Sequence, residues 1–229
     1  MTAEMLGSMI LLTSVLTAVV YASLPRLRRH RKLDDKVFAF LRRHESDTNN
    51  KLMSAVTVLA GHNFLVPANL SLIAFFLYVR RRSWFFIRIA AIAMSSLLLM
   101  FLLKSIFKRK RPRDPLFHQV KGLSFPSGHS IFAVTFYGLM IYITNHSIHG
   151  RAAKIAIITG FIGLINIIGL SRVWLRVHYA SDVLAGFAIG STWLIISLAT
   201  LMKLEPEASR IQWMFGGRLL GTGVAPSSL

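Results

Sequence analysis

The sequence lacks cysteine and has few acidic residues, and both absences narrow what the chain can be. Without cysteine among its 229 residues, it holds no disulfide framework, no Cys-ligated zinc site and no catalytic thiol. Charged residues make up only 16% of the chain, against about 25% in an ordinary soluble domain. Because hydrophobic residues reach 54%, the composition also argues against a disordered chain.

The charge that is present is strongly one-sided. The chain has 27 Lys and Arg against 9 Asp and Glu, a formal net charge of +18. These basic residues lie at the ends of long apolar runs, which is the pattern of an integral membrane protein. The partners that the charge predicts are therefore membrane lipids with anionic headgroups and a phosphorylated substrate, not nucleic acid.

The apolar runs predict an all-α fold, an integral membrane bundle of six transmembrane helices. A helix of 20 residues is about 30 Å long, enough to cross the bilayer core. The second run is interrupted at Gly61-His62-Asn63, and we expect it to bend near Pro67. The whole chain, 1–229, is predicted to form one domain with a C-terminal tail at 203–229. The predicted spans are Met5–Leu24, Leu52–Val79, Ser83–Leu103, Ser130–Thr144, Ala152–Leu170 and Val183–Met202.

The polar segments between these spans are also informative. Lys36–Arg43, after the first span, is predicted to form a short amphipathic helix on the membrane surface. With six spans, Arg26–Lys51, Lys104–Gly128 and Ser171–Ser181 fall on the same side of the membrane. These three segments contain 18 of the 27 Lys and Arg residues. The positive-inside rule alone would therefore place them in the cytoplasm.

Three polar clusters lie on that predicted face. They are Lys104–Pro112 after the third span, Phe125–Ser130 at the start of the fourth, and Ser171–Asp182 between the fifth and sixth. The first and third carry cations, and arginine can clamp two phosphate oxygens at once. The second predicts a helix N-terminus, whose free backbone N–H groups form an anion site. The candidate phosphate-binding residues are Lys104, Arg111, Ser127, Gly128 and Arg172.

Two histidines and one carboxylate complete a set of residues suited to phosphoryl transfer. His178 and Asp182 are four residues apart and can share a helix face, where the carboxylate would hydrogen-bond one imidazole nitrogen. The other nitrogen of His178 is then the candidate nucleophile. His129 is the candidate general acid. We expect no metal and no cofactor, because the fixed cations can stabilise the transferred group.

Several neighbouring residues have simpler interpretations. The run Lys108–Lys110, which includes Arg109, is interpreted as an interfacial basic cluster. Trp174 and Tyr179 are interpreted as interfacial aromatic residues, and His62 as hydrogen-bonded packing within the second span.

The three clusters resemble the signature of the type 2 phosphatidic acid phosphatase (PAP2) family. K-x6-R-P occurs at Lys104–Pro112, P-S-G-H at Pro126–His129, and S-R-x5-H-x3-D at Ser171–Asp182. The stretch from Lys32 to Gly61, with Asp35 ahead of the amphipathic segment, is similar to the family more weakly. The resemblance implies a phosphatase in which His178 attacks phosphorus, forming a phosphohistidine. Asp182 would orient that histidine, and His129 would protonate the leaving lipid oxygen.

The resemblance also implies a substrate class and a location. Phosphatidate, phosphatidylglycerophosphate, undecaprenyl diphosphate and a lipid A phosphate all remain candidate substrates. A lipid phosphotransferase would use the same residues, whereas a non-catalytic lipid-phosphate binder or transporter could dispense with His178 or His129. The family resemblance implies a multi-pass protein of a bacterial inner membrane, with an active site that faces the periplasm or the exterior. The sequence predicts no oligomeric state.

Overall fold

The computed structural model describes residues 31–79, 83–116 and 122–205, and every regular element among them is a helix. The prediction of an all-α fold is therefore confirmed for these residues. The predicted first span, Met5–Leu24, and residues 206–229 of the tail lie outside the described part of the chain. The elements are α2 (Arg31–Arg42), α3 (Asp47–Val58), α4 (His62–Ala74), the π-helical turn η1 (Phe75–Val79), α5 (Ser83–Phe107), α6 (Gly128–Ser147), α7 (Arg151–Trp174) and α8 (Ala180–Leu204).

Four helical segments of the described chain are long and apolar enough to cross a membrane. They are Asp47–Val79, Trp84–Phe107, Arg151–Trp174 and Ala180–Leu204. Helix α6 is not among them, although it had been predicted as the fourth span. It packs against α5, α7 and α8 and buries polar side chains such as Ser130 and Thr135, which lower its mean hydropathy. Six spans are therefore not confirmed.

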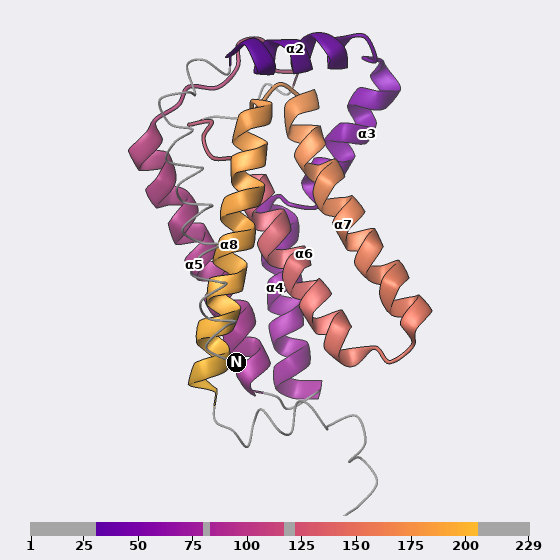
Figure 1. Ribbon diagram of the computed structural model, residues 1–229, viewed down its shortest axis with the longest axis vertical. Coiled ribbons are helices and arrows are strands. Elements are labelled where there is room, and N and C mark those ends of the chain that lie inside the picture. Colours follow the sequence, from indigo (N-terminus) through magenta and orange to yellow (C-terminus); the bar gives the residue numbers. More distant parts are fainter. Residues whose placement is uncertain (1–30, 80–82, 117–121, 206–229) are drawn as a thin grey trace, which may run out of the picture.

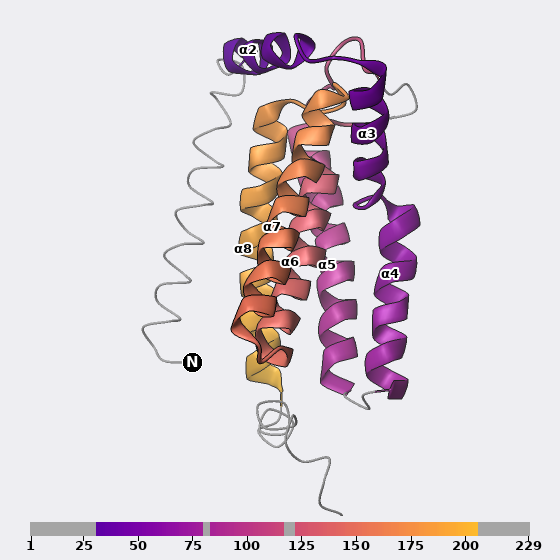
Figure 2. The same ribbon diagram turned by 90° about the vertical axis from the view of Figure 1, so that its right-hand side faces the viewer.

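The second apolar segment is broken at a glycine and not at its proline. Helix α3 ends at Val58, and α4 begins at His62 with Gly61 as its extended N-cap residue. The two helices are visibly offset at this break (Figure 2). Helix α4 continues through Pro67 without interruption, and the expected bend near that proline stays a prediction. The change of direction is made where backbone hydrogen bonding is already interrupted, at Gly61.

Helix α2 is the predicted amphipathic segment, although it starts five residues earlier than expected. It lies across one end of the bundle, nearly perpendicular to the long helices (Figure 1). Asp34 and Leu41, seven residues apart, are buried on one side, while Leu33 and Phe40 are exposed on another. A helix repeats every 3.6 residues, so this spacing gives α2 two distinct faces.

The long helices bring the three polar clusters to the end that α2 covers. Helices α5 and α7 finish there, and α6 and α8 begin there (Figures 1 and 2). Glycine lets α8 approach α6 closely at this end. A Cβ atom at Gly186 would lie only 2.7 Å from Cβ of Ser130 and 2.9 Å from the carbonyl oxygen of Ser127. Only a residue without a side chain fits such a contact, which holds the start of α8 beside the start of α6.

Candidate active site

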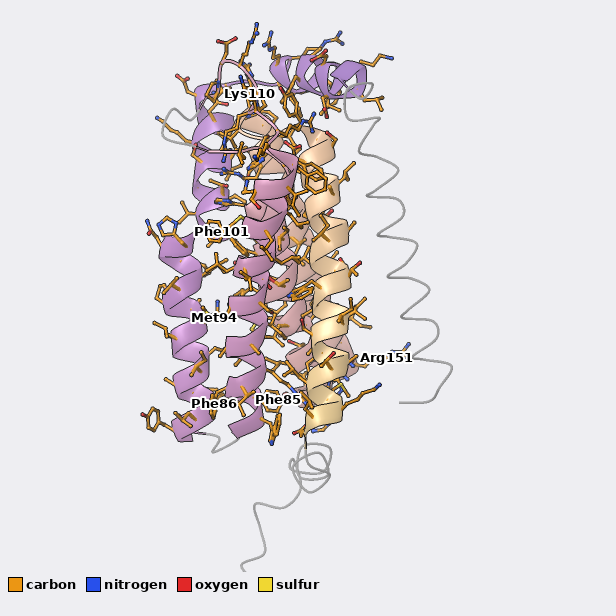
Figure 3. The ribbon with its side chains drawn as sticks, turned by 90° about the vertical axis from the view of Figure 1, so that its left-hand side faces the viewer. Phe85, Phe86, Met94, Phe101, Lys110 and Arg151 are labelled. Atoms are coloured by element: carbon orange, nitrogen blue, oxygen red, sulfur yellow. The ribbon has the colours of Figure 1, made fainter. Side chains whose placement is uncertain are left out.

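The predicted site residues lie at the α2 end of the bundle. In Figure 3, Lys110 of the first cluster lies beside α2, whereas Arg151, at the start of α7, lies at the opposite end. Because the segments after α5, before α6 and between α7 and α8 share this end, the sequence-based prediction that the three clusters converge is confirmed.

His178 and Asp182 come together, although not on one helix face as expected. His178 lies in the segment between α7 and α8, and α8 begins only at Ala180. Asp182 occupies the third position of α8, where its Oδ2 accepts the backbone N–H of Tyr179 at 3.0 Å. This capping contact turns the carboxylate back toward the preceding segment. Nδ1 of His178 is consequently 3.7 Å from Oδ2 of Asp182, and both side chains are buried.

The other imidazole nitrogen of His178 faces a cation. Nη1 of Arg111 is 3.3 Å from Nε2 of His178 and donates to the carbonyl oxygen of Val177 at 2.8 Å. Arginine can only donate hydrogen bonds, so Nε2 accepts and Nδ1 carries the proton. This tautomer directs the Nε2 lone pair toward the guanidinium of Arg111.

Burial keeps His178 neutral. Removal from water lowers the pKa of its imidazole to about 4, the interaction with Asp182 opposes this shift, and the charges of Arg172 and Arg111 reinforce it. Above that pKa the ring carries no charge, which is the form that can attack phosphorus.

Lys104, Arg111 and Arg172 lie within electrostatic range of one another. The charges of Arg111 and Arg172 act on the ammonium of Lys104, and that of Arg111 acts on Arg172. Each side chain is held by a separate contact: Lys104 Nζ donates to the carbonyl oxygen of Leu123 at 2.6 Å, and Arg172 Nη1 donates to Oγ1 of Thr57 at 2.7 Å. Like charges held together repel, and an anion between them relieves that repulsion.

Ser127 and Gly128 begin α6, as predicted. Oγ of Ser127 caps the helix by accepting the N–H of Ser130 at 3.4 Å and its hydroxyl at 2.9 Å. The backbone N–H of Ser127 donates to the carbonyl oxygen of Asp182 at 3.1 Å. Ser127 therefore has a structural role that joins the starts of α6 and α8, and its contact with phosphate remains a prediction.

His129 follows directly at the start of α6 and is half-buried. The charges of Arg172, His178 and Arg111 act on its ring, so it belongs to the same cluster. Its Nε2 lies near the break between α3 and α4, where a Cβ atom at Gly61 would be 3.9 Å away. The structure thus brings the second histidine to the cations and to His178.

Comparison with known proteins identifies the family. Residues 84–205, more than half of the chain, match the family model described as the PAP2 superfamily. This chain belongs to the PAP2 superfamily. It is 33% identical over 145 residues to phosphatidylglycerophosphatase B of Bacillus subtilis (strain 168), covering 62% of this chain and 70% of that relative.

The solved structures agree with this assignment. A transmembrane PAP2-type phosphatidylglycerolphosphate phosphatase from Bacillus subtilis is similar at a TM-score of 0.72 and 26% identity, over 86% of this chain and 96% of that one. LpxE of Aquifex aeolicus shares the fold at a TM-score of 0.55 and 23% identity, over 73% of this chain and 95% of that chain. The protein is thus a multi-pass membrane hydrolase of the PAP2 lipid phosphatase family.

The α2 end of this PAP2 protein also contains residues that could not be found from the sequence. Ser124, fully buried, donates its hydroxyl to Oδ2 of Asp182 at 2.5 Å and lies 3.5 Å from Nδ1 of His178. Thr57 of α3 holds Arg172, as described above. A serine or threonine outside a motif gives no signal of such a contact, because its partner is more than 50 residues away.

Arg109 is the clearest correction. The interpretation of this residue as part of an interfacial basic cluster is wrong, since its guanidinium forms ion pairs with Asp34 and Asp182. It also lies over the ring of Tyr179, 4.0 Å from the centroid. The signal available in the sequence is the small number of acidic residues. An acidic residue that is buried requires a cation beside it, which predicts that some of the basic residues enter the protein.

The two aromatic residues are likewise more than interfacial. Tyr179 stacks on the guanidinium of Arg109, and Trp174 is buried and donates from Nε1 to Asn50 at 2.8 Å.

An apolar cavity of about 300 Å³ opens between α4, α5 and α6. His62, which was interpreted as hydrogen-bonded packing, is instead exposed and lines this cavity. The cavity extends along the bundle from the region of His62 toward Leu139. Its other lining residues include Leu65, Ile73, Ile92, Leu97, Phe132 and Phe136.

Proposed function

We propose that this PAP2 protein hydrolyses the phosphate monoester of phosphatidylglycerophosphate through a phosphohistidine on Nε2 of His178, without a metal. The observation that carries the proposal is the placement of Nε2 against Arg111, with Asp182 on the other side of the ring. The choice among the four candidate lipids rests on the similarity to the Bacillus phosphatidylglycerophosphatase B.

The first chemical step forms one bond and breaks another. Nε2 of His178 attacks phosphorus, and the bond between phosphorus and the lipid oxygen breaks. His129 acts in its protonated form, which the negative charge of a bound phosphate favours, and donates its proton to that oxygen, which leaves as an alcohol. Asp182 stabilises the positive charge that develops on the imidazole and keeps Nε2 directed at phosphorus.

The second step reverses these roles. A water molecule attacks phosphorus of the phosphohistidine and gives a proton to His129, and the bond between phosphorus and Nε2 breaks. Inorganic phosphate leaves, and both histidines return to their starting states. In both steps Lys104, Arg111 and Arg172, with the hydroxyl of Ser127 and the backbone N–H of Gly128, would stabilise the negative oxygens.

The apolar cavity supports a lipid substrate. It lies along the same helix, α6, whose first turn carries His129, and its lining is almost entirely apolar. A lipid whose phosphate lies between the cations could place part of an acyl chain there, where burial of each CH₂ contributes about 0.8 kcal/mol.

Phosphate release from a panel of lipids tests the proposal. The purified protein in detergent would be assayed with EDTA present against all four candidate substrates. We expect phosphatidylglycerophosphate to give the highest kcat/KM. A preference for another lipid would contradict the substrate assignment, and an absolute need for added magnesium or zinc would contradict the metal-free mechanism. Transfer of the phosphate to an added lipid alcohol would show a phosphotransferase instead.

We also propose that the catalytic end faces the periplasm or the cell exterior, as the resemblance implies. The positive-inside rule argues for the cytoplasm, but several basic residues at this end have other tasks. Arg109 and Arg176 form ion pairs with acidic side chains, and Lys104, Arg111 and Arg172 are the proposed phosphate clamp. Five of the 18 cations therefore serve the protein itself, which weakens the argument from loop charge.

Cysteine labelling checks this orientation, because the chain has no native cysteine. Lys110 and Arg151 are both exposed and lie at opposite ends of the bundle (Figure 3). We expect a membrane-impermeant maleimide to label Lys110→Cys in intact cells, and to label Arg151→Cys only after lysis. The reverse pattern would place the catalytic end in the cytoplasm, and labelling of both in sealed cells would contradict an odd number of crossings between the two sites.

A further inference from the structure

Arg109 lies between two buried carboxylates that come from distant parts of the chain. Its Nη1 donates to Oδ1 of Asp182 at 2.5 Å and to Oγ of Ser181 at 2.8 Å, while Nη2 donates to Oδ2 of Asp34 at 3.0 Å. Its side chain is 15% exposed. Both terminal nitrogens thus donate to side chains of the protein, which sets Arg109 apart from the proposed phosphate clamp.

Asp34 joins α2 to the start of α8. Its carboxylate accepts the backbone N–H of Ser181 at 3.1 Å and the hydroxyl of Ser181 at 2.9 Å, in addition to Arg109. Only 2% of Asp34 is exposed. A carboxylate at the N-terminus of a helix satisfies free N–H groups there, so Asp34 fixes the first turn of α8 from a separate helix.

These contacts leave Asp182 with few alternative positions. Oδ2 is held by Ser124 and by the N–H of Tyr179, and Oδ1 is held by Arg109. Loss of the arginine would leave a fully buried carboxylate without its ion-pair partner, which is strongly unfavourable. The carboxylate would then turn toward another cation and away from Nδ1 of His178.

We propose that Arg109 and Asp34 are positioning residues for catalysis: Arg109 holds Asp182 against His178, and Asp34 holds Arg109. This inference rests on the proposed role of Asp182. Two acids share one cation in this arrangement, so Arg109 does not fully neutralise the negative charge of Asp182 beside the imidazole. That charge stabilises the positive charge that His178 acquires during attack.

Steady-state kinetics of Arg109→Gln and Asp34→Asn test the proposal, on whichever lipid of the panel the wild-type protein hydrolyses. We expect Arg109→Gln to lower kcat about 10- to 100-fold, by analogy with the loss found when residues that orient metal ligands are removed. KM should stay within about threefold, because neither residue touches the phosphate. Asp34→Asn keeps part of the hydrogen bonding and should lower kcat less.

The chain offers matched controls for both changes. Lys110 and Asp35 are neighbours of the same charge that are exposed. Lys110→Gln and Asp35→Asn should leave kcat within about twofold of the wild-type value, as expected for exposed charges. If the controls lose as much activity as Arg109→Gln and Asp34→Asn, general surface charge is the cause and the proposal is overturned.

The double variant shows whether Asp34 acts through Arg109 or has an independent structural effect. If Asp34 acts through Arg109, adding Asp34→Asn to Arg109→Gln costs little further activity; independent losses that multiply would overturn the proposal. Should Arg109→Gln fail to fold in detergent, Arg109→Lys keeps the charge but lacks the two-pronged geometry. If that variant keeps the wild-type kcat, whether KM is unchanged or raised, the proposal is also overturned. Absence of wild-type activity on phosphatidylglycerophosphate, with activity on another lipid, refutes only the proposed substrate.

Discussion

Purified protein carrying His178→Ala is expected to lose at least about 10⁴-fold in kcat, the scale of loss when a catalytic nucleophile is removed. In the proposed reaction Nε2 of that ring is the atom that attacks phosphorus, so the variant has no nucleophile. The cations would still bind the lipid phosphate, so we expect the variant to retain affinity for substrate or for vanadate while it releases no phosphate.

Folding of the variant must be shown in the same preparation. His178 is buried, and truncation to alanine leaves a cavity, so thermal unfolding and gel filtration in detergent accompany the kinetics. His178→Asn serves as a second variant because it retains more of the side-chain volume and a polar group. Activity of either variant within tenfold of wild type would contradict the assignment of the nucleophile.

The second large effect is expected for His129→Ala, and it should depend on the leaving group. A lipid oxygen leaves as a poor alkoxide unless it receives a proton, so general acid catalysis contributes about 10²- to 10⁴-fold. We expect a loss of that size with a lipid phosphate. An activated aryl phosphate needs no proton in the first step and should lose far less.

The comparison is made on single-turnover rates, so that hydrolysis of the phosphohistidine does not obscure the first step. Lys104→Gln is a useful contrast, because loss of a phosphate-binding cation should slow both substrates to a similar extent. Equal losses for the two substrates in His129→Ala would mean that His129 binds phosphate and does not protonate the leaving group.

The local parts of this site could be predicted from the sequence because their information lies in short spacings. The N-cap Ser127 at the start of α6 is readable from the residues around it. The alternation of apolar runs and polar clusters also predicted correctly that Lys104, His129 and His178 lie at one end of the bundle. Even the partnership of His178 with Asp182 was predicted, although capping geometry and not a shared helix face brings them together.

The contacts between distant segments could not be predicted in the same way. Arg109 and Asp34 are 75 residues apart, and the sequence around Arg109 is a plain basic run. Nothing local distinguishes the cation that enters the protein from Lys110, which stays exposed. The break at Gly61 could be predicted, because a glycine followed by two polar residues interrupts the apolar run there.

The enclosure of α6 has a consequence for how the protein is assembled in the bilayer. Nine of its residues are buried, among them Ser130, Thr135 and Thr144, and such hydroxyls prefer helix neighbours to lipid. We therefore expect insertion of α6 to be cooperative with insertion of α5, α7 and α8, against which it packs. A chain truncated after α6 would lack α7 and α8, two of the helices against which α6 packs. Since α6 carries His129, we expect the proposed general acid to become fixed only when α8 has brought Asp182 beside Ser127. An incomplete bundle would then be catalytically silent, with no partly formed hydrolase acting on lipids during biosynthesis.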